Sequence, residues 1–116
     1  MRARDRVWMA GERAAREAYV ARGYRVVASN WRCPLGELDL VVARDGLVVF
    51  CEVKARGSPL AAPHEAVGVA KRRKVRAVAE AFLASTNRRA SAYRFDVASV
   101  TVAGGAPHVH LYEDAF

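Results

Sequence analysis

Two runs of mostly apolar residues, separated by one Asp-Gly dipeptide, fill residues 36–56 (GELDLVVARDGLVVFCEVKAR). Asp-Gly favours a two-residue type I′ turn, in which both central residues have positive φ. The segment therefore predicts a β-hairpin with Asp45 and Gly46 at the turn and with Arg44 paired to Leu47. Because side chains alternate between the two faces of a strand, this one pair fixes the face and the partner of every other residue in the hairpin.

The same register brings two acids face to face. Asp39 falls opposite Glu52, and Glu37 falls opposite Lys54. Two carboxylates directly across a strand pair repel each other, since their Cβ atoms are only about 5 Å apart. We expect a divalent cation, Mg²⁺ or Mn²⁺, between Asp39 and Glu52, because these ions prefer hard oxygen ligands and complete their shells with water and substrate phosphates. The acidic face is predicted to carry Glu37, Asp39, Val41, Ala43, Val48, Phe50, Glu52 and Lys54, and the apolar face Leu38, Leu40, Val42, Val49, Cys51 and Val53.

Lys54 is predicted to share the face of Glu52, two residues further along the strand. From there an ammonium group could orient an attacking water or neutralise charge that develops on a phosphate. A simpler alternative is an exposed strand face on which Glu37 and Lys54 form an ordinary cross-strand pair. The residues alone leave both interpretations open.

The spacing of Asp39 and Glu52-Val53-Lys54 resembles the PD-(D/E)xK motif of the restriction-endonuclease-like nucleases, with Leu38 in the place of the proline. More narrowly, the chain resembles the YraN-like family of bacterial proteins, which is related in fold to archaeal Holliday-junction resolvases. The matching pieces cover nearly the whole chain in the family's order. They are Gly11-Glu12 with Ala15, Gly23-Tyr24, Asn30-Trp31-Arg32, Gly36-Glu37-Leu38-Asp39, the run from Val49 to Arg56, Glu65-Ala66-Val67, Lys71, Arg94-Phe95-Asp96-Val97 and Ala115-Phe116.

This resemblance implies an α/β, restriction-endonuclease-like fold with a mixed β-sheet flanked by helices. It also implies a Mg²⁺- or Mn²⁺-dependent endonuclease that hydrolyses phosphodiester bonds of DNA, including branched or structured DNA. It assigns catalysis to Asp39, Glu52, Lys54 and Glu12, with Asp39, Glu52 and Glu12 as metal ligands. Without the resemblance, Glu12 beside Trp8 would be expected to point to solvent. Because branched-DNA resolvases act as dimers, a homodimer is a further expectation.

Length and composition limit the number of domains and the kinds of partner that the chain can have. With 116 residues, 53% of them hydrophobic, the chain has enough apolar surface for one domain, residues 1–116. A net charge of +7 and a pI near 10.1 favour an anionic partner, for which nucleic acid, DNA above all, is the natural candidate. No apolar run is long enough for a bilayer span or a signal peptide, so we expect a cytoplasmic protein with no membrane partner.

Basic residues after the hairpin are the expected nucleic-acid contacts. Lys71 falls on the apolar side of a predicted helix, so its stem should cover apolar surface while its ammonium reaches the helix's N-terminal end. The alternative for this basic run is a solvated helix face. The competing function is a non-catalytic module that binds DNA or RNA through this run, Arg76 and the arginine-rich first helix, without metal and with strong salt dependence. The expected contacts are Arg56, Lys71, Arg72, Arg73 and Lys74.

Hydrophobic periodicity predicts the remaining elements. The expected apolar faces are Trp8, Ala15, Ala18 and Tyr19 in the first helix, and Val67, Val75, Val78, Ala79 and Phe82 in the second. The order helix, three strands, helix, two strands favours an α/β sandwich with a mixed sheet. The elements are helices at residues 4–22 and 64–86, strands at 24–29, 93–102 and 108–112, and loops at 30–35 and 57–63.

Four further residues carry specific expectations. Gly23 is expected to end the first helix in a left-handed conformation. Asp96 has no acidic neighbour in sequence, so we expect it to hold a basic side chain rather than a metal. Cys33 and Cys51 lack the spacing of zinc or redox sites, and we expect both to be reduced.

Overall fold

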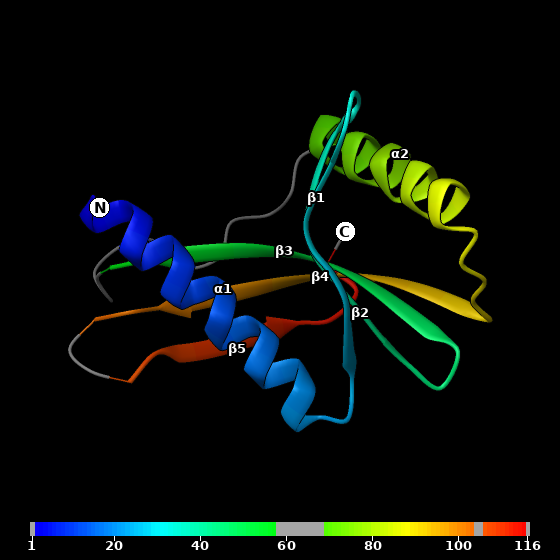
Figure 1. Ribbon diagram of the computed structural model, residues 1–116. Helices are drawn as coiled ribbons and strands as arrows, with labels where there is room; N and C mark the ends of the chain where they lie inside the picture. Colours follow the sequence, from blue (N-terminus) through cyan, green and yellow to red (C-terminus); the bar gives the residue numbers. More distant parts are fainter. Residues whose placement is uncertain (1, 58–68, 104–105, 116) are drawn as a thin grey trace.

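The computed structural model describes residues 2–57, 69–103 and 106–115, and its elements follow the predicted order (Figure 1). The α/β fold with a mixed sheet is therefore confirmed. Most of the predicted loop at 57–63 and the predicted helical residues 64–68, Val67 among them, lie outside the described residues. The elements are α1 (Ala3–Ala21), β1 (Arg25–Cys33), β2 (Gly36–Arg44), β3 (Leu47–Arg56), α2 (Val69–Thr86), β4 (Ala92–Thr101) and β5 (His108–Tyr112).

The described strands form one five-stranded sheet in the order β1-β2-β3-β4-β5. β3 and β4 are parallel, whereas the other neighbouring strands are antiparallel. A parallel pair needs a crossover connection, and α2 lies in the segment that provides it. Figure 1 shows α1 lying across one face of the sheet and α2 beside the far end of the β1-β2 hairpin.

Alternation along β2 and β3 sends side chains into two apolar cores. Leu40, Val42 and Val49 pack with Ala15 and Tyr19 of α1. The second core joins Val41, Val48 and Phe50 of the strands to Val75, Val78, Ala79 and Phe82 of α2. These α2 residues are the buried positions that periodicity predicts, apart from Val67. Neither helix, over the described residues, is long and apolar enough to cross a membrane.

The predicted turn and register of the β2-β3 hairpin are confirmed. Asp45 and Gly46 have φ values of 48° and 80°, and Arg44 pairs with Leu47. The ladder runs from that pair to Leu40 and Cys51 and ends there. The predicted pairing of Glu37 with Lys54 is therefore wrong.

Before Leu40, the residues of β2 pair with β1 but no longer with β3. The sequence predicts a loop at 30–35, but β1 continues to Cys33, and Trp31 pairs with Leu38. The end of this hairpin bends over α2, where the Trp31 and Phe82 rings meet edge to face with centroids 5.2 Å apart. Leu38 consequently joins the core beneath α2, and its predicted place beside Leu40 is wrong.

A buried polar cluster holds α1, β4 and the residues after β5 together. Asp96 is fully buried, and it accepts hydrogen bonds from Tyr19 Oη at 2.8 Å and from Asp114 N–H at 2.9 Å. Two Arg94 nitrogens also donate to its oxygens, each at 2.9 Å. This hydrogen bonding raises the pKa of Arg94 further above its usual range. The prediction that Asp96 holds a basic side chain is confirmed.

Candidate metal and phosphate site

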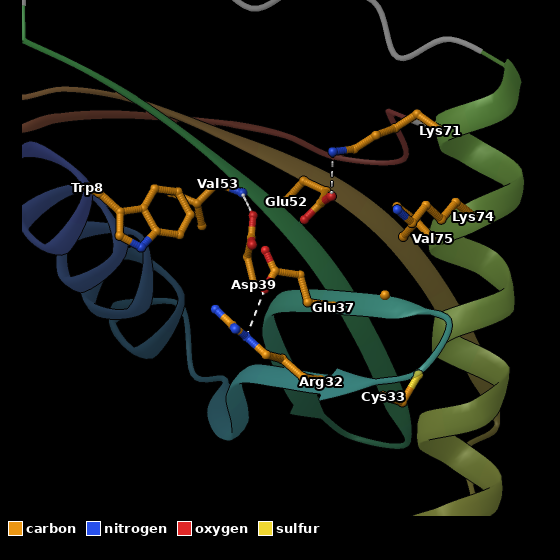
Figure 2. A pocket seen from close by; sticks show the side chains of 11 residues that line it. Trp8, Arg32, Cys33, Glu37, Asp39, Glu52, Val53, Lys71, Lys74 and Val75 are labelled. Atoms are coloured by element: carbon orange, nitrogen blue, oxygen red, sulfur yellow. Dashed lines mark hydrogen bonds and ion pairs between the residues drawn. The ribbon is translucent and has the colours of Figure 1, made fainter. Parts of the chain in front are cut away.

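A pocket of about 580 Å³ is lined by residues of α1, the end of β1, the start of β2, the middle of β3 and the start of α2 (Figure 2). We call it the acidic pocket. Its volume falls within the range of about 300–1,000 Å³ that is usual for ligand sites. Its lining includes Trp8, Glu37, Asp39, Glu52, Lys71 and Lys74.

Asp39 and Glu52 both line the acidic pocket, one residue beyond the last ladder pair of their strands. Only 9% of Asp39 and 7% of Glu52 is exposed. Asp39 Oδ2 accepts a hydrogen bond from Val53 N–H at 2.8 Å, which satisfies a backbone donor where the ladder has ended. The structure thus brings together the two acids that the hairpin register predicts to be neighbours.

The environment of Asp39 favours its protonated form. Burial, reinforced by a hydrogen bond with Glu52 and by the charge of Glu52, raises the pKa of Asp39 to about 8, although the Val53 N–H bond acts in the opposite direction. The raised pKa therefore favours a protonated Asp39 near neutral pH. A cation that binds both carboxylates would replace this proton.

Among the described residues, Lys71 forms an ion pair with Glu52. Its Nζ lies 3.1 Å from Glu52 Oε1, and Figure 2 shows the side chain extending from α2 toward Glu52. Lys74 lines the same pocket and forms no ion pair with any described residue. Lys54 is exposed on β3 and is not among the residues that line the pocket. The sequence predicts Lys71 as a phosphate contact but misses its contact with Glu52, because the two lie on different elements.

Glu12 lies apart from the acid pair. It is 6% exposed, so the expectation from the residues alone that it points to solvent is wrong. Its Oε1 lies 2.6 Å from Arg16 Nη1, and Asn30 Nδ2 donates to Oε1 and Oε2 at 3.0 and 2.8 Å. In the described part of the chain, no three His, Cys, Asp or Glu side chains are grouped closely enough to hold a metal. A metal role for Glu12 stays a prediction.

Glu12 lines a second pocket, of about 340 Å³, which we call the arginine pocket. Its other lining residues are Trp8, Met9, Arg13, Arg16, Asn30 and Arg32. Trp8 and Arg32 line both pockets. Arg32 Nε lies 3.1 Å from Glu37 Oε2, yet 78% of the Arg32 side chain is exposed.

The sequence does not predict the arginine pocket, because two of its lining residues fall in residues 30–35, which are predicted to be a loop. Asn30 has a φ of 51° within β1, and this bend accompanies its contact with Glu12. The pair of Glu12 and Arg16 follows helix spacing, since residues four apart lie on one face, and could have been predicted. Asn30 and Arg32 could not, because their positions depend on the pairing of β1 with β2.

The other predicted nucleic-acid contacts lie away from these two pockets. Arg72 and Arg73 are exposed near the start of α2. Arg56 Nε donates to Thr101 Oγ1 at 3.0 Å across the parallel strands β3 and β4. These arginines could contact a nucleic acid only if it extends beyond the acidic pocket, and their roles stay predictions.

The donor set of the acidic pocket fits a hard divalent cation. Mg²⁺ is commonly bound in proteins through one or two carboxylates, with waters and substrate phosphates in its remaining positions. Asp39 and Glu52 supply two such carboxylates, and the pocket leaves space for the other ligands. Lys71 and Lys74 place positive charge on the opposite wall, where a bound phosphate would need it.

Comparison with known proteins identifies the family of this chain. The model of the "Uncharacterised protein family UPF0102" matches residues 11–100. A UPF0102 protein of Beutenbergia cavernae is 47% identical over 115 residues, which cover 96% of this chain and 97% of the relative. The UPF0102 protein STH1475 of Symbiobacterium thermophilum is 41% identical over 113 residues, or 96% of each chain. With relatives that match over nearly their full length, the chain belongs to the protein family UPF0102, the YraN-like family that its motifs resemble.

Proposed function

We propose that this protein is a cytoplasmic, metal-dependent endonuclease that hydrolyses phosphodiester bonds of DNA, with Asp39 and Glu52 as ligands of Mg²⁺ or Mn²⁺. One observation supports it most strongly: two buried carboxylates from adjacent strands share a pocket with two lysines. Placing like charges together in a buried site costs stability, so such pairs are more typical of functional sites than of structural ones. The net charge of +7 supports an anionic substrate.

In the proposed reaction, a water oxygen bonds to phosphorus, the bond to one ester oxygen breaks, and that leaving oxygen gains a proton. A divalent cation would lower the pKa of the attacking water and stabilise charge on the phosphoryl oxygens. Asp39 must release its proton to act as a ligand. Lys71 would exchange Glu52 for the phosphate, and Lys74 would contact the same charge. The family resemblance also implies Lys54 at the phosphate and Glu12 as an outer ligand, but neither lines the acidic pocket, so the reaction proposed here rests on Asp39, Glu52, Lys71 and Lys74.

A cleavage panel tests this proposal. Linear, nicked, flapped and branched DNA would be incubated with Mg²⁺, Mn²⁺ or chelator, and with the native protein or Asp39→Asn. We expect metal-dependent cutting that falls at least ~100-fold in Asp39→Asn, since the variant loses a charged ligand at the reacting phosphate. Glu37→Gln is the matched control, because Glu37 lines the same pocket but is paired with Arg32, and it should cut normally. Failure to cut any of these substrates would contradict the proposal.

A second candidate function is a nucleic-acid-binding module without catalysis. One observation favours it: Lys71 pairs with Glu52 while Asp39 tends to hold a proton, so the acids are neutralised without a metal. Such a module would bind phosphates through its basic residues, with a strong salt dependence and no need for Mg²⁺. The two functions differ in whether a divalent cation stabilises the folded protein.

A further inference from the structure

Trp8 lies between two pockets, one lined by the acid pair and the other by arginines. The indole contributes to the lining of both the acidic pocket and the arginine pocket. It packs on the α1 core with only part of its surface, so the ring is half-buried. Figure 2 shows it extending from α1 to lie beside Val53, and Asp39 lines the same pocket. A partly exposed aromatic side chain beside a phosphate site is a typical stacking platform for a nucleobase.

The charges on either side of Trp8 suit two successive phosphates. On one side, Lys71 and Lys74 line the acidic pocket. On the other side, three arginines line the arginine pocket together with a single carboxylate, that of Glu12. Arg16 and Asn30 already satisfy this carboxylate. Arg13 is exposed and forms no ion pair with any described residue, so it remains available for an anion.

We infer that the substrate carries an unpaired nucleotide next to the scissile phosphate, with its base stacked on Trp8 and its neighbouring phosphate in the arginine pocket. This inference rests on the proposed nuclease function. Bases within a duplex are covered by their neighbours on both faces, so only an unstacked base can lie against the indole. The acids are also recessed between two helices, where a flexible single strand enters more readily than a duplex. Gaps, flaps and unpaired junction arms satisfy this requirement, whereas a continuous duplex does not.

A binding experiment in chelator tests the inference without any catalysis. The probe is a DNA duplex in which one strand lacks three nucleotides, so that the opposite strand is unpaired there and carries 2-aminopurine. The comparison probe is the same duplex with the gap filled. We expect the native protein to bind the gapped probe at least ten-fold more tightly and to quench its fluorescence. Trp8→Leu should lose about ten-fold in affinity for the gapped probe, which corresponds to about 1.4 kcal/mol and lies within the range for stacking. Trp8→Phe should recover part of this loss and guards against a folding defect, which thermal melting would reveal.

Two controls locate the effect. Tyr93→Leu removes an aromatic side chain that is 50% exposed in a different pocket, formed by α2 and β4, and should bind as the native protein does. Arg13→Gln should reduce the slope of log affinity against log salt by about 0.7, the value for one single-strand phosphate contact. Equal affinity of the native protein for the two probes, or an unchanged preference in Trp8→Leu, would overturn the inference.

The result is separable from the nuclease proposal. If the protein cuts no substrate but prefers the gapped probe through Trp8, the nuclease proposal is contradicted and the recognition of unpaired nucleotides is supported. Cutting of continuous and gapped DNA at equal rates, with no effect of Trp8→Leu, would remove only the inference about the unpaired nucleotide.

Discussion

Asp39 links the chemistry of the site to the stability of the protein. Its pKa is about 8 in the folded state and near 4 in an unfolded chain, so between these values the folded state holds a proton that the unfolded state has lost. Stability rises with pH only where the unfolded state binds more protons, and here the folded state does. The contribution of Asp39 is therefore fully present below about pH 4 and decreases as the pH rises to about 8, by at most ~1.4 kcal/mol per pH unit.

Urea unfolding between pH 5 and pH 9 measures this effect. Asp39→Asn keeps an acceptor for Val53 N–H but binds no proton, so its free energy of unfolding should fall less steeply with pH than that of the native protein. Glu37→Gln should retain most of the native slope, because the charge of Glu37 makes the smallest contribution to the raised pKa of Asp39. Equal slopes for native protein and Asp39→Asn would show that Asp39 is already ionised in the folded state.

The residues of the acid pair could be predicted because a local signal fixes them. Asp45-Gly46 sets the register, and the register brings Asp39 and Glu52 together. Lys71 could not be assigned to Glu52 in the same way. Its distance from Glu52 depends on how α2 docks on the sheet, which a pattern within α2 does not encode.

At the scale of elements, one glycine sets how closely α1 approaches the sheet. A Cβ added at Gly11 would lie 2.5 Å from Ala55 Cβ, a distance too short for two carbon atoms. Glycine within a helix otherwise costs about 1 kcal/mol relative to alanine, so its presence here is explained by the close approach of α1 to β3. Because α1 carries Trp8 and Glu12, the same contact positions both pockets.

We expect Gly11→Ala to lower the free energy of unfolding by about 1–3 kcal/mol, despite the better helix propensity of alanine, because the added methyl group overpacks the interface. Ala55→Gly in the same protein removes the atom it meets, and the next contact, with residue 55 Cα, is an ordinary 3.6 Å. The double variant should therefore be more stable than Gly11→Ala, and a double-mutant cycle in denaturant measures the coupling. A cycle with no coupling energy would mean that α1 can shift at no cost.

The length of β1 shows where element prediction from sequence stops. The sequence predicts a loop at 30–35, where Asn30 and Pro34 are residue types typical of loops. The structure keeps Asn30 within β1 at positive φ, because pairing with β2 and the contact of Trp31 with Phe82 stabilise the extended hairpin. The predicted pairing of Glu37 with Lys54 requires a β2 that stays paired with β3 along its length, whereas the ladder ends at Leu40 and Leu38 packs beneath α2.

At the scale of the whole molecule, the order of elements was predictable and the joining of distant parts was not. Periodicity and turn residues suffice for two helices and for the β2-β3 hairpin. The buried cluster around Asp96 joins α1, β4 and the residues after β5, and such contacts follow only from the assembled sheet. The acidic pocket has the same origin, since it needs α1, β2, β3 and α2 at once.

A ligand of that pocket should therefore stabilise the entire fold rather than one element. At a concentration 100 times its dissociation constant, Mg²⁺ or Mn²⁺ would add about 2.7 kcal/mol, which corresponds to a rise in melting temperature on the order of 10 °C for a chain of this size. The rise should be larger at pH 8 than at pH 6, because Asp39 must lose its proton to bind the ion. Differential scanning fluorimetry with each ion and with chelator measures it, and Asp39→Asn with Glu52→Gln should abolish it. A melting temperature that neither ion changes would leave Lys71 as the complete counterion of Glu52, and the metal-free binding module would then be the better account of the protein.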